Sequence, residues 1–203
     1  MACPIQIIGR RCYAISAWPN SWDATATQQR WSFRSCRRII SQLLNCCVSC
    51  CERIDHGLGC TYFANRYNAQ IILTGSQDDS STVQEVAGCT RVQPLNLAGK
   101  TSMGGLAALI SKLDLFISND TGPSHIANAV DTPSLTIFGP ADPRRWAALD
   151  KARHPIVRKP VECSPCGYWE CPIDHRCLEW LKPEAVIGAA EKLLTRGEVA
   201  CNA

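Results

Sequence analysis

The sequence lacks any apolar run approaching the ~18–20 residues that a membrane-spanning helix needs. It also lacks a strong charge of one sign, because 21 Lys and Arg against 18 Asp and Glu leave a net charge of +3. That balance is too mild to argue for nucleic acid or a membrane surface as a partner. The N-terminus, MACPIQIIGRRC, has no basic stretch ahead of an apolar core, so no signal peptide is expected and a cytoplasmic location is favoured.

Nothing in the overall composition indicates disorder. The 203 residues are 46% hydrophobic and 19% charged, and both values are ordinary for a globular protein. A chain of this length suits one domain, or one domain with a ragged extension.

Cysteine is the abundant residue, with 14 copies, eight of them in residues 1–60. Without a signal peptide these thiols are expected to stay reduced, so a disulfide framework is the less favoured account. Near the C-terminus, Cys163, Cys166, Cys171 and Cys177 follow the spacing C-x2-C-x4-C-x5-C. Four such thiolates can hold a tetrahedral zinc ion. The alternatives are small buried side chains, or a labile disulfide pair that pins this part of the chain.

Residues 1–66 show no sustained helical or strand period, and we expect an atypical, poorly ordered segment. The string CCVSCC at 46–51, together with His56 and Cys60, can be drawn as a second zinc site. The competing hypothesis is that this stretch is a frame-shifted or truncated stretch of coding sequence.

From residue 67 onward, strand and helix patterns alternate. Apolar runs that end in turn residues predict buried strands, and runs with a 3.6-residue period predict helices. The alternation predicts an α/β fold with a Rossmann-like parallel sheet, in a domain at 67–195 that is followed by a tail at 196–203. Strands are expected at 68–76, 92–97, 113–118 and 134–139, and helices at 78–88, 103–113, 123–130 and 183–194.

The stretch LDLFISNDTGPSHIANAV (113–130) carries the clearest functional signal. Asp120 falls just past a strand end, where ligands of open α/β sheets bind. Pro123 suits the first position of a helix, and the free N–H groups at a helix N-terminus bind phosphate. Ser124 and His125 add side-chain donors at the same place. The alternative is that Asp120 only caps the helix and that His125 packs on the sheet.

The series NLAGKTS, SNDTGPSHIA and TPSLTIFGP resembles glycosyltransferase family 9, the ADP-heptose:lipopolysaccharide heptosyltransferases. The later CSPCGYWECPIDHRCLEWLKPEAV is similar to the heptosyltransferase II branch. The resemblance covers residues 67–195. It implies the C-terminal, nucleotide-binding half of a GT-B fold.

By position, the resemblance also implies roles for individual residues. His125 would stabilise the leaving diphosphate, and Asp120 would orient the loop or contact the transferred sugar. One of Asp78 and Asp79 would contact the ribose, and the sequence leaves open which. The implied diphosphate loop continues through Thr121, Gly122, Pro123 and Ser124, and the implied nucleoside site also includes Gly75, Ser76, Lys100 and Thr101.

The implied reaction is an inverting transfer of heptose from ADP-heptose to the lipopolysaccharide inner core. No metal is required for catalysis, and a structural zinc at the C-terminal cysteines is the only cofactor considered. The catalytic base is expected in an N-terminal domain that this chain does not carry. Expected partners are the nucleotide-sugar donor and the lipopolysaccharide acceptor, with peripheral contact to the inner membrane and no nucleic acid. The alternatives are a non-catalytic nucleotide-binding fragment and a cysteine-rich zinc-binding interaction module.

Overall fold

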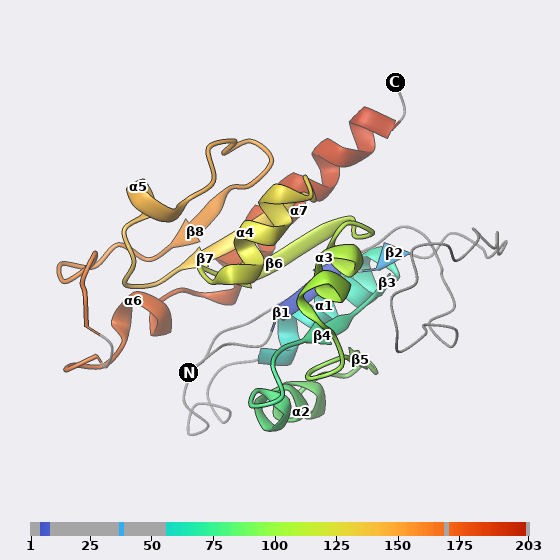
Figure 1. Cartoon of the computed structure of the whole chain (residues 1–203), viewed down its shortest axis with the longest axis horizontal. Coiled ribbons are helices and arrows are strands. Elements are labelled where there is room, and N and C mark those ends of the chain that lie inside the picture. The colour runs from blue at the N-terminus through green and yellow to red at the C-terminus, as the bar shows by residue number, and fades with distance from the viewer. Residues whose placement is uncertain (1–4, 9–36, 39–55, 169–170, 202–203) are drawn as a thin grey trace, which may run out of the picture.

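A six-stranded sheet forms the centre of the computed structural model, which describes residues 5–8, 37–38, 56–168 and 171–201 (Figure 1). The pairs β4/β5, β6/β7 and β7/β8 are parallel. The spatial order corresponds to the 3-2-1-4-5-6 order of a doubly wound Rossmann sheet, so the predicted Rossmann-like α/β fold is confirmed. In that order the strands are β5 (Leu95–Asn96), β4 (Ile72–Thr74), β1 (Ile5–Ile8), β6 (Leu115–Asn119), β7 (Ser134–Phe138) and β8 (Ile156–Arg158).

One strand departs from the predicted parallel pattern. β1 lies between β4 and β6 and runs antiparallel to both, with Ile5 opposite Thr74 and Gln6 opposite Ile117. It comes from the part of the sequence in which no element was expected, because four residues are too few to show a strand period. A second, two-stranded sheet pairs β2 (Arg37–Arg38) with β3 (Ala69–Gln70) in parallel.

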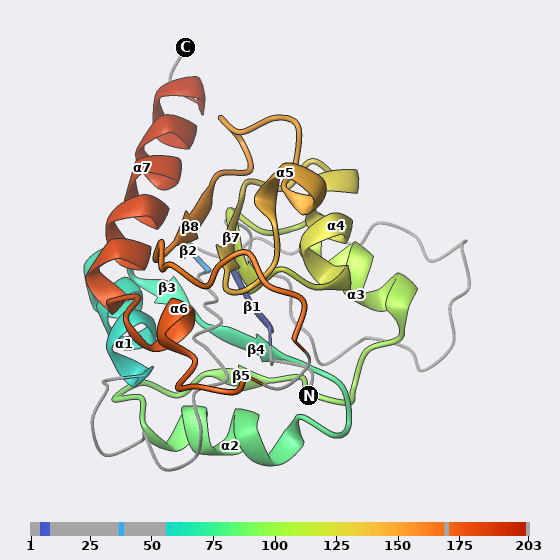
Figure 2. The same ribbon diagram turned by 90° about the vertical axis from the view of Figure 1, so that its left-hand side faces the viewer.

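Helices cover both faces of the main sheet (Figure 2). On one face α1 (His56–Tyr67), α2 (Ser80–Gly88) and α7 (Pro183–Cys201) share one hydrophobic cluster with β6 and β7. On the other face α3 (Met103–Ile110) and α4 (Gly122–Ala129) pack against Ile72 and Phe116. Two single-turn helices, α5 (Pro143–Trp146) and α6 (Arg176–Glu179), belong to the loops that follow β7 and β8.

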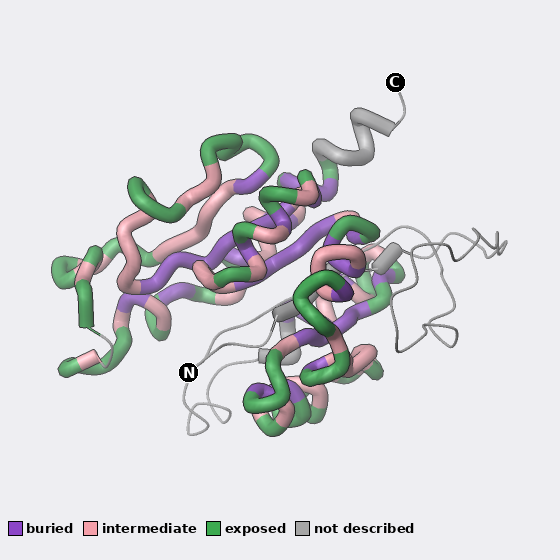
Figure 3. Tube along the Cα trace, in the orientation of Figure 1, coloured by how far each residue is buried: buried purple, intermediate pink, exposed green. Residues whose placement is uncertain are grey.

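The central strands are buried on both sides, which explains why their sequences read as unbroken apolar runs. In β6, Leu115 and Ile117 face the α7 side and Phe116 faces the α3–α4 side, and all three side chains are fully buried. Figure 3 shows this burial as a continuous purple trace through β6 and β7. In the described part of the chain, no helix combines the length and apolar character that crossing a membrane requires.

The predicted elements lie close to the observed ones, with three differences. The apolar run 68–76 is divided at Ile71 into β3 and β4. The last helix continues to Cys201, because a single glycine such as Gly197 costs a helix only about 1 kcal/mol and does not have to end it. α1 begins at His56, inside the segment 1–66 that was expected to be poorly ordered, and contributes the buried Cys60 and Phe63 to the core. The expected domain limits at 66/67 and 195/196 remain predictions. The cysteines of CCVSCC lie outside the described residues.

Candidate functional site

The loop between β6 and α4 has the form that the sequence predicted. Past the end of β6, the backbone N–H of Asp120 still donates to Ile137 O of β7 over 3.2 Å. Thr121 is the extended N-cap residue, and Gly122 begins the helix. Pro123 therefore occupies the second helical position rather than the predicted first. Its fixed φ suits either position, and neither needs an N–H donor.

Ser124 differs from the predicted outward-facing donor. Its side chain is buried, and its hydroxyl donates to Thr121 O over 2.8 Å. Its backbone N–H donates to the same oxygen over 3.0 Å. Because the extended N-cap residue leaves its carbonyl within reach, the hydroxyl closes the first turn of α4. Any direct role of Ser124 toward a ligand remains a prediction.

Asp120 and His125 lie together at the mouth of this loop. Burial raises the pKa of the half-buried Asp120 carboxyl, and the nearby charge of His125 partly offsets that rise. His125 is exposed rather than packed on the sheet. Its ring centroid lies 6.3 Å from that of Trp146 in α5, with the two planes inclined by 56°. A carboxyl group, an imidazole and an indole therefore share one edge of the sheet.

Trp146 was not among the predicted site residues. The sequence showed only a Pro- and Arg-rich loop after β7, and a loop gives no direction to its side chains. The structure shows α5 held by its cap: the Asp142 carboxylate accepts the Arg144 backbone N–H over 3.0 Å and also the Arg144 guanidinium. The signal available in the sequence was an Asp-Pro pair, a common helix start, just before a tryptophan.

A second loop, after β4, gives different surroundings to the two aspartates between which the sequence left the ribose contact open. Asp79 is buried, and its Oδ2 accepts the backbone N–H of Ser76 over 2.7 Å and the Ser76 hydroxyl over 2.6 Å. A Cβ at Gly75 would lie 2.9 Å from Asp79 Cβ, so this turn needs glycine there. Asp79 thus holds the turn, whereas Asp78 is exposed to solvent. Asp78 is the better candidate for a ligand contact.

The third predicted segment, after β5, is fastened to the second loop. The backbone N–H of Gly99 donates to Gly75 O over 3.0 Å. Gly99 has φ +68°, and a Cβ there would clash with the Gln77 side chain, so both the backbone and the space call for glycine. Lys100 Nζ donates to Asn96 O over 3.1 Å, and Thr101 is half-buried.

All three loops leave the carboxyl ends of parallel strands and so lie along the same edge of the sheet. Only β1 lies between β4 and β6. The loops that follow these two strands are therefore two strand spacings apart, or about 10 Å. The structure thus brings the predicted nucleoside loops together and places the predicted diphosphate loop beside them, at the switch point of the strand order.

The C-terminal cysteines lie next to this edge. The Cys166 backbone N–H donates to Pro140 O over 2.9 Å, and the Ser164 hydroxyl donates to Gly139 O over 3.2 Å, so the cysteine loop is tied to the end of β7. Burial raises the pKa of the Cys177 thiol, and the thiols of Cys166, Cys163 and Cys171 raise it further.

These thiols do not form a metal site as arranged. All four are free thiols, and Cys163 is exposed while Cys177 is buried. Among the described residues, no group of three or more His, Cys, Asp or Glu side chains is placed to hold a metal ion. A structural zinc at these cysteines therefore remains a prediction from their spacing alone.

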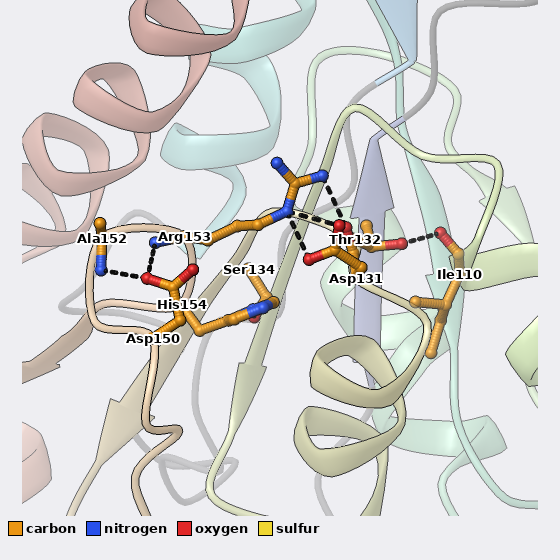
Figure 4. Close-up of polar contacts among 8 residues, drawn as sticks. All are labelled: Ile110, Asp131, Thr132, Ser134, Asp150, Ala152, Arg153 and His154. Carbon is orange, nitrogen blue, oxygen red and sulfur yellow. Dashed lines mark hydrogen bonds and ion pairs between the residues drawn. The ribbon is translucent and has the colours of Figure 1, made fainter.

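A separate polar cluster lies at the opposite edge of the sheet (Figure 4). His154 is buried, and its Nδ1 lies 2.8 Å from the Ser134 hydroxyl at the start of β7. Arg153 forms an ion pair of 2.8 Å with Asp131 and also donates to Asp131 O. The Asp150 carboxylate accepts the backbone N–H groups of Ala152 and Arg153. The cluster fastens the turn before β8 to the α4–β7 loop, and we assign it a structural role.

We expect this cluster to make the fold sensitive to mild acid. Burial lowers the pKa of His154 below its ordinary 6.5, although Asp131 and Asp150 act in the opposite sense. The unfolded chain then binds more protons below pH 6.5, so the free energy of unfolding falls as the pH drops through that value. Urea denaturation at about pH 7.5 and 5.5 measures the loss. In His154→Asn the pH dependence in this interval should flatten, and an unchanged slope would contradict the assignment.

The comparisons with known proteins identify the family and the fold of this chain. The model of glycosyltransferase family 9 (heptosyltransferase) matches residues 62–176, more than half of the chain. Lipooligosaccharide heptosyltransferase 2 of Campylobacter jejuni is 37% identical over 101 residues, which are 49% of this chain and 32% of that protein. Lipopolysaccharide heptosyltransferase 3 of Escherichia coli K12 is 37% identical over 134 residues, which are 62% of this chain and 37% of that protein.

Two solved structures share the fold. A glycosyl transferase family 9 protein from Veillonella parvula superposes with a TM-score of 0.61 at 24% identity, over 77% of this chain and 45% of that one. The ADP-heptose LPS heptosyltransferase II of E. coli superposes with a TM-score of 0.56 at 22% identity, over 70% of this chain and 42% of that one. The chain spans about a third of the length of the curated relatives and less than half of the solved structures. On the family match across residues 62–176, the chain belongs to glycosyltransferase family 9.

Proposed function

We propose that this chain is the donor-binding, C-terminal half of a GT-B glycosyltransferase that transfers heptose from ADP-heptose to the lipopolysaccharide inner core. The observation that carries the proposal is the N-terminus of α4, which opens at the switch point of the sheet with Asp120 and His125 beside it. The names of the related proteins support the sugar and the acceptor.

The proposed chemistry is an inverting displacement at the anomeric carbon. An acceptor hydroxyl forms the new glycosidic bond and loses its proton to a carboxylate base, while the bond from the anomeric carbon to the diphosphate breaks. The partial positive charge at the N-terminus of α4 and the His125 side chain stabilise the charge that develops on the leaving diphosphate. The base is expected outside this chain, in the part of the related proteins that it does not span.

Asp120 takes a different role from the loop that follows it. A carboxylate repels phosphate, so we assign Asp120 to the transferred sugar, whose hydroxyl groups donate hydrogen bonds, or to the orientation of the loop. The nucleoside would lie across the loops after β4 and β5, with Asp78 toward the ribose and Lys100–Thr101 toward the base. The proposed reaction requires no metal, and we place it in the cytoplasm at the inner face of the inner membrane.

Calorimetric titration with ADP and ADP-heptose tests the proposal, with UDP-sugars as the comparison. We expect saturable adenine-nucleotide binding, weakened about tenfold or more in His125→Ala, since hydrogen bonds to charged groups contribute roughly 1.5–3 kcal/mol. His175→Asn is the matched control, because His175 is exposed but lies in the cysteine loop, and asparagine tolerates its positive φ. A folded chain that binds none of these nucleotides would overturn the proposal, as would equal affinity in His125→Ala.

Two other candidate functions make different predictions in the same preparation. A non-catalytic nucleotide-binding fragment would bind ADP but would not transfer heptose even when supplied with an acceptor-binding half. A cysteine-rich zinc-binding module would contain stoichiometric zinc after purification and lose it when the upstream cysteines are replaced. Metal analysis of the purified chain separates this second candidate from the proposal.

A further inference from the structure

Within residues 56–168 and 171–201, positive charge is concentrated in one surface segment. Residues 143–160 hold six of the chain's 21 lysines and arginines but only one of its 18 acidic residues. This segment therefore has a net charge of +5, and the rest of the chain, whose total is +3, has a net charge of −2. The segment follows β7, forms α5, and then returns to the sheet as the outermost strand β8.

Of these six cations, two are neutralised locally, three are not, and Arg158 is half-buried in β8. Arg144 pairs with Asp142 over 2.8 Å, and Arg153 pairs with Asp131 over 2.8 Å. Arg145, Lys151 and Lys159 are exposed and form no ion pair with another described residue. The segment thus presents cations that lack a partner of opposite charge within the described structure.

Exposed apolar side chains accompany these cations. Leu149 is 98% exposed and Trp146 is 51% exposed. The exposure of Leu149 belongs to a defined turn, in which the Lys151 backbone N–H donates to Leu149 O and the Asp150 carboxylate accepts two further N–H groups. The guanidinium of Arg145 lies 5.7 Å from the centre of the Trp146 ring. Aliphatic and indole side chains are therefore interspersed with arginine and lysine.

We propose that this surface, formed by Arg145, Trp146, Leu149 and Lys151, docks the protein on an anionic phospholipid membrane. Tryptophan prefers the interface between headgroups and acyl chains, and an exposed leucine gains by entering it. Each cation near an anionic surface typically strengthens binding about fivefold. Nucleic acid matches the charge but not Leu149, because an aliphatic side chain cannot stack on a base as an aromatic ring does.

The docking surface also adjoins the candidate site. Trp146 belongs to it and lies 6.3 Å, ring to ring, from His125 at the mouth of the α4 loop. Docking would hold that loop near the lipid headgroups, where a lipid-linked acceptor presents its sugars. In this respect the inference rests on the proposed function, whereas the binding to lipid does not require nucleotide.

Flotation with phospholipid vesicles tests the inference. The full chain is mixed with vesicles of phosphatidylcholine, either alone or with about 30% phosphatidylglycerol, at low and at high salt. We expect binding only to the anionic vesicles, weakened by salt. The double variant Arg145→Gln with Lys151→Gln should lose roughly tenfold or more of this binding, and Leu149→Ser should also weaken it.

Matched controls come from α3 and the turn that follows it. Met103→Ser removes an apolar side chain that is 69% exposed, and Lys112→Gln removes an exposed cation. Equal binding to neutral vesicles, or equal losses in these controls, would overturn the inference. Unchanged vesicle binding in Leu149→Ser, together with displacement of the vesicles by a single-stranded oligonucleotide, would also overturn the inference. That result would indicate a nucleic-acid surface.

Parallel ADP titration of the same samples keeps the two proposals apart. Absent vesicle binding with intact ADP affinity would overturn the membrane inference alone. Vesicle binding without ADP affinity would overturn the proposed function alone. Leu149→Ser should leave the far-ultraviolet circular dichroism unchanged, since its side chain contributes almost nothing to the packed interior.

Discussion

Replacing Phe116 with alanine is expected to lower the free energy of unfolding by about 3–5 kcal/mol. Phe116 is fully buried in β6 and packs between the helices that cover that face of the sheet, against Ile110 of α3 and Ala127 of α4. Truncation removes its transfer free energy and leaves a cavity that the neighbouring helices only partly fill. Because a typical domain is stable by about 5–15 kcal/mol, the loss is a large part of the total.

The same substitution should also weaken nucleotide binding beyond what unfolding explains. α4 rests on Phe116, and its N-terminus forms the proposed diphosphate loop. Urea denaturation gives the stability, and calorimetry at a temperature where the variant is still folded gives the ADP affinity. Met103→Ala is the control, with an expected change within about 0.5 kcal/mol, because Met103 is mostly exposed. A loss in Phe116→Ala below about 1 kcal/mol would contradict the packing described here.

Replacing Phe63 with alanine is expected to have a similar effect, again about 3–5 kcal/mol. Phe63 lies in α1 and is 1% exposed, with Tyr62 edge-on at 5.5 Å and Tyr67 at 6.0 Å between ring centres. Both tyrosine hydroxyls donate to Glu191 of α7, over 2.7 and 3.0 Å. Burial and the Glu191 contact raise the pKa of Tyr67 to about 12, so the hydroxyl keeps its proton throughout the useful pH range.

Thermal or urea denaturation of Phe63→Ala would show whether α1 is an integral part of the domain. Tyr168→Ala is the matched control, because Tyr168 is an aromatic residue that is 67% exposed. A small effect in Phe63→Ala, comparable with that of Tyr168→Ala, would mean that the independent domain begins after α1, near the predicted boundary at residue 67.

The parts of the fold that could be predicted from the sequence are those with local signals. The apolar run 134–139 became β7, and Ser102 caps α3 through its side chain, which accepts the Gly105 N–H. The strand–turn–helix pattern around Asp120 was predicted nearly residue by residue, because proline has a fixed φ that suits the first turn of a helix and glycine is common in turns.

The unpredicted features depend on distant partners. β1 pairs with strands that lie far along the chain, and no local period marks a four-residue strand. Which aspartate holds the turn after β4 depends on the close approach of Asp79 to Gly75 and Ser76. The basic segment 143–160 was missed for a different reason. The net charge of the whole chain, +3, is the sum of +5 in this segment and −2 in the rest of the chain.

The position of β1 has a consequence for the association of this protein with itself. β1 is the only link between the pair β5–β4 and the trio β6–β7–β8 within the described main sheet, and it satisfies the main-chain groups of both neighbours. When it detaches, β4 and β6 each present an open edge of unpaired N–H and C=O groups. Open edges recruit strands from other molecules, so we expect loss of these four residues to promote strand exchange between molecules and aggregation.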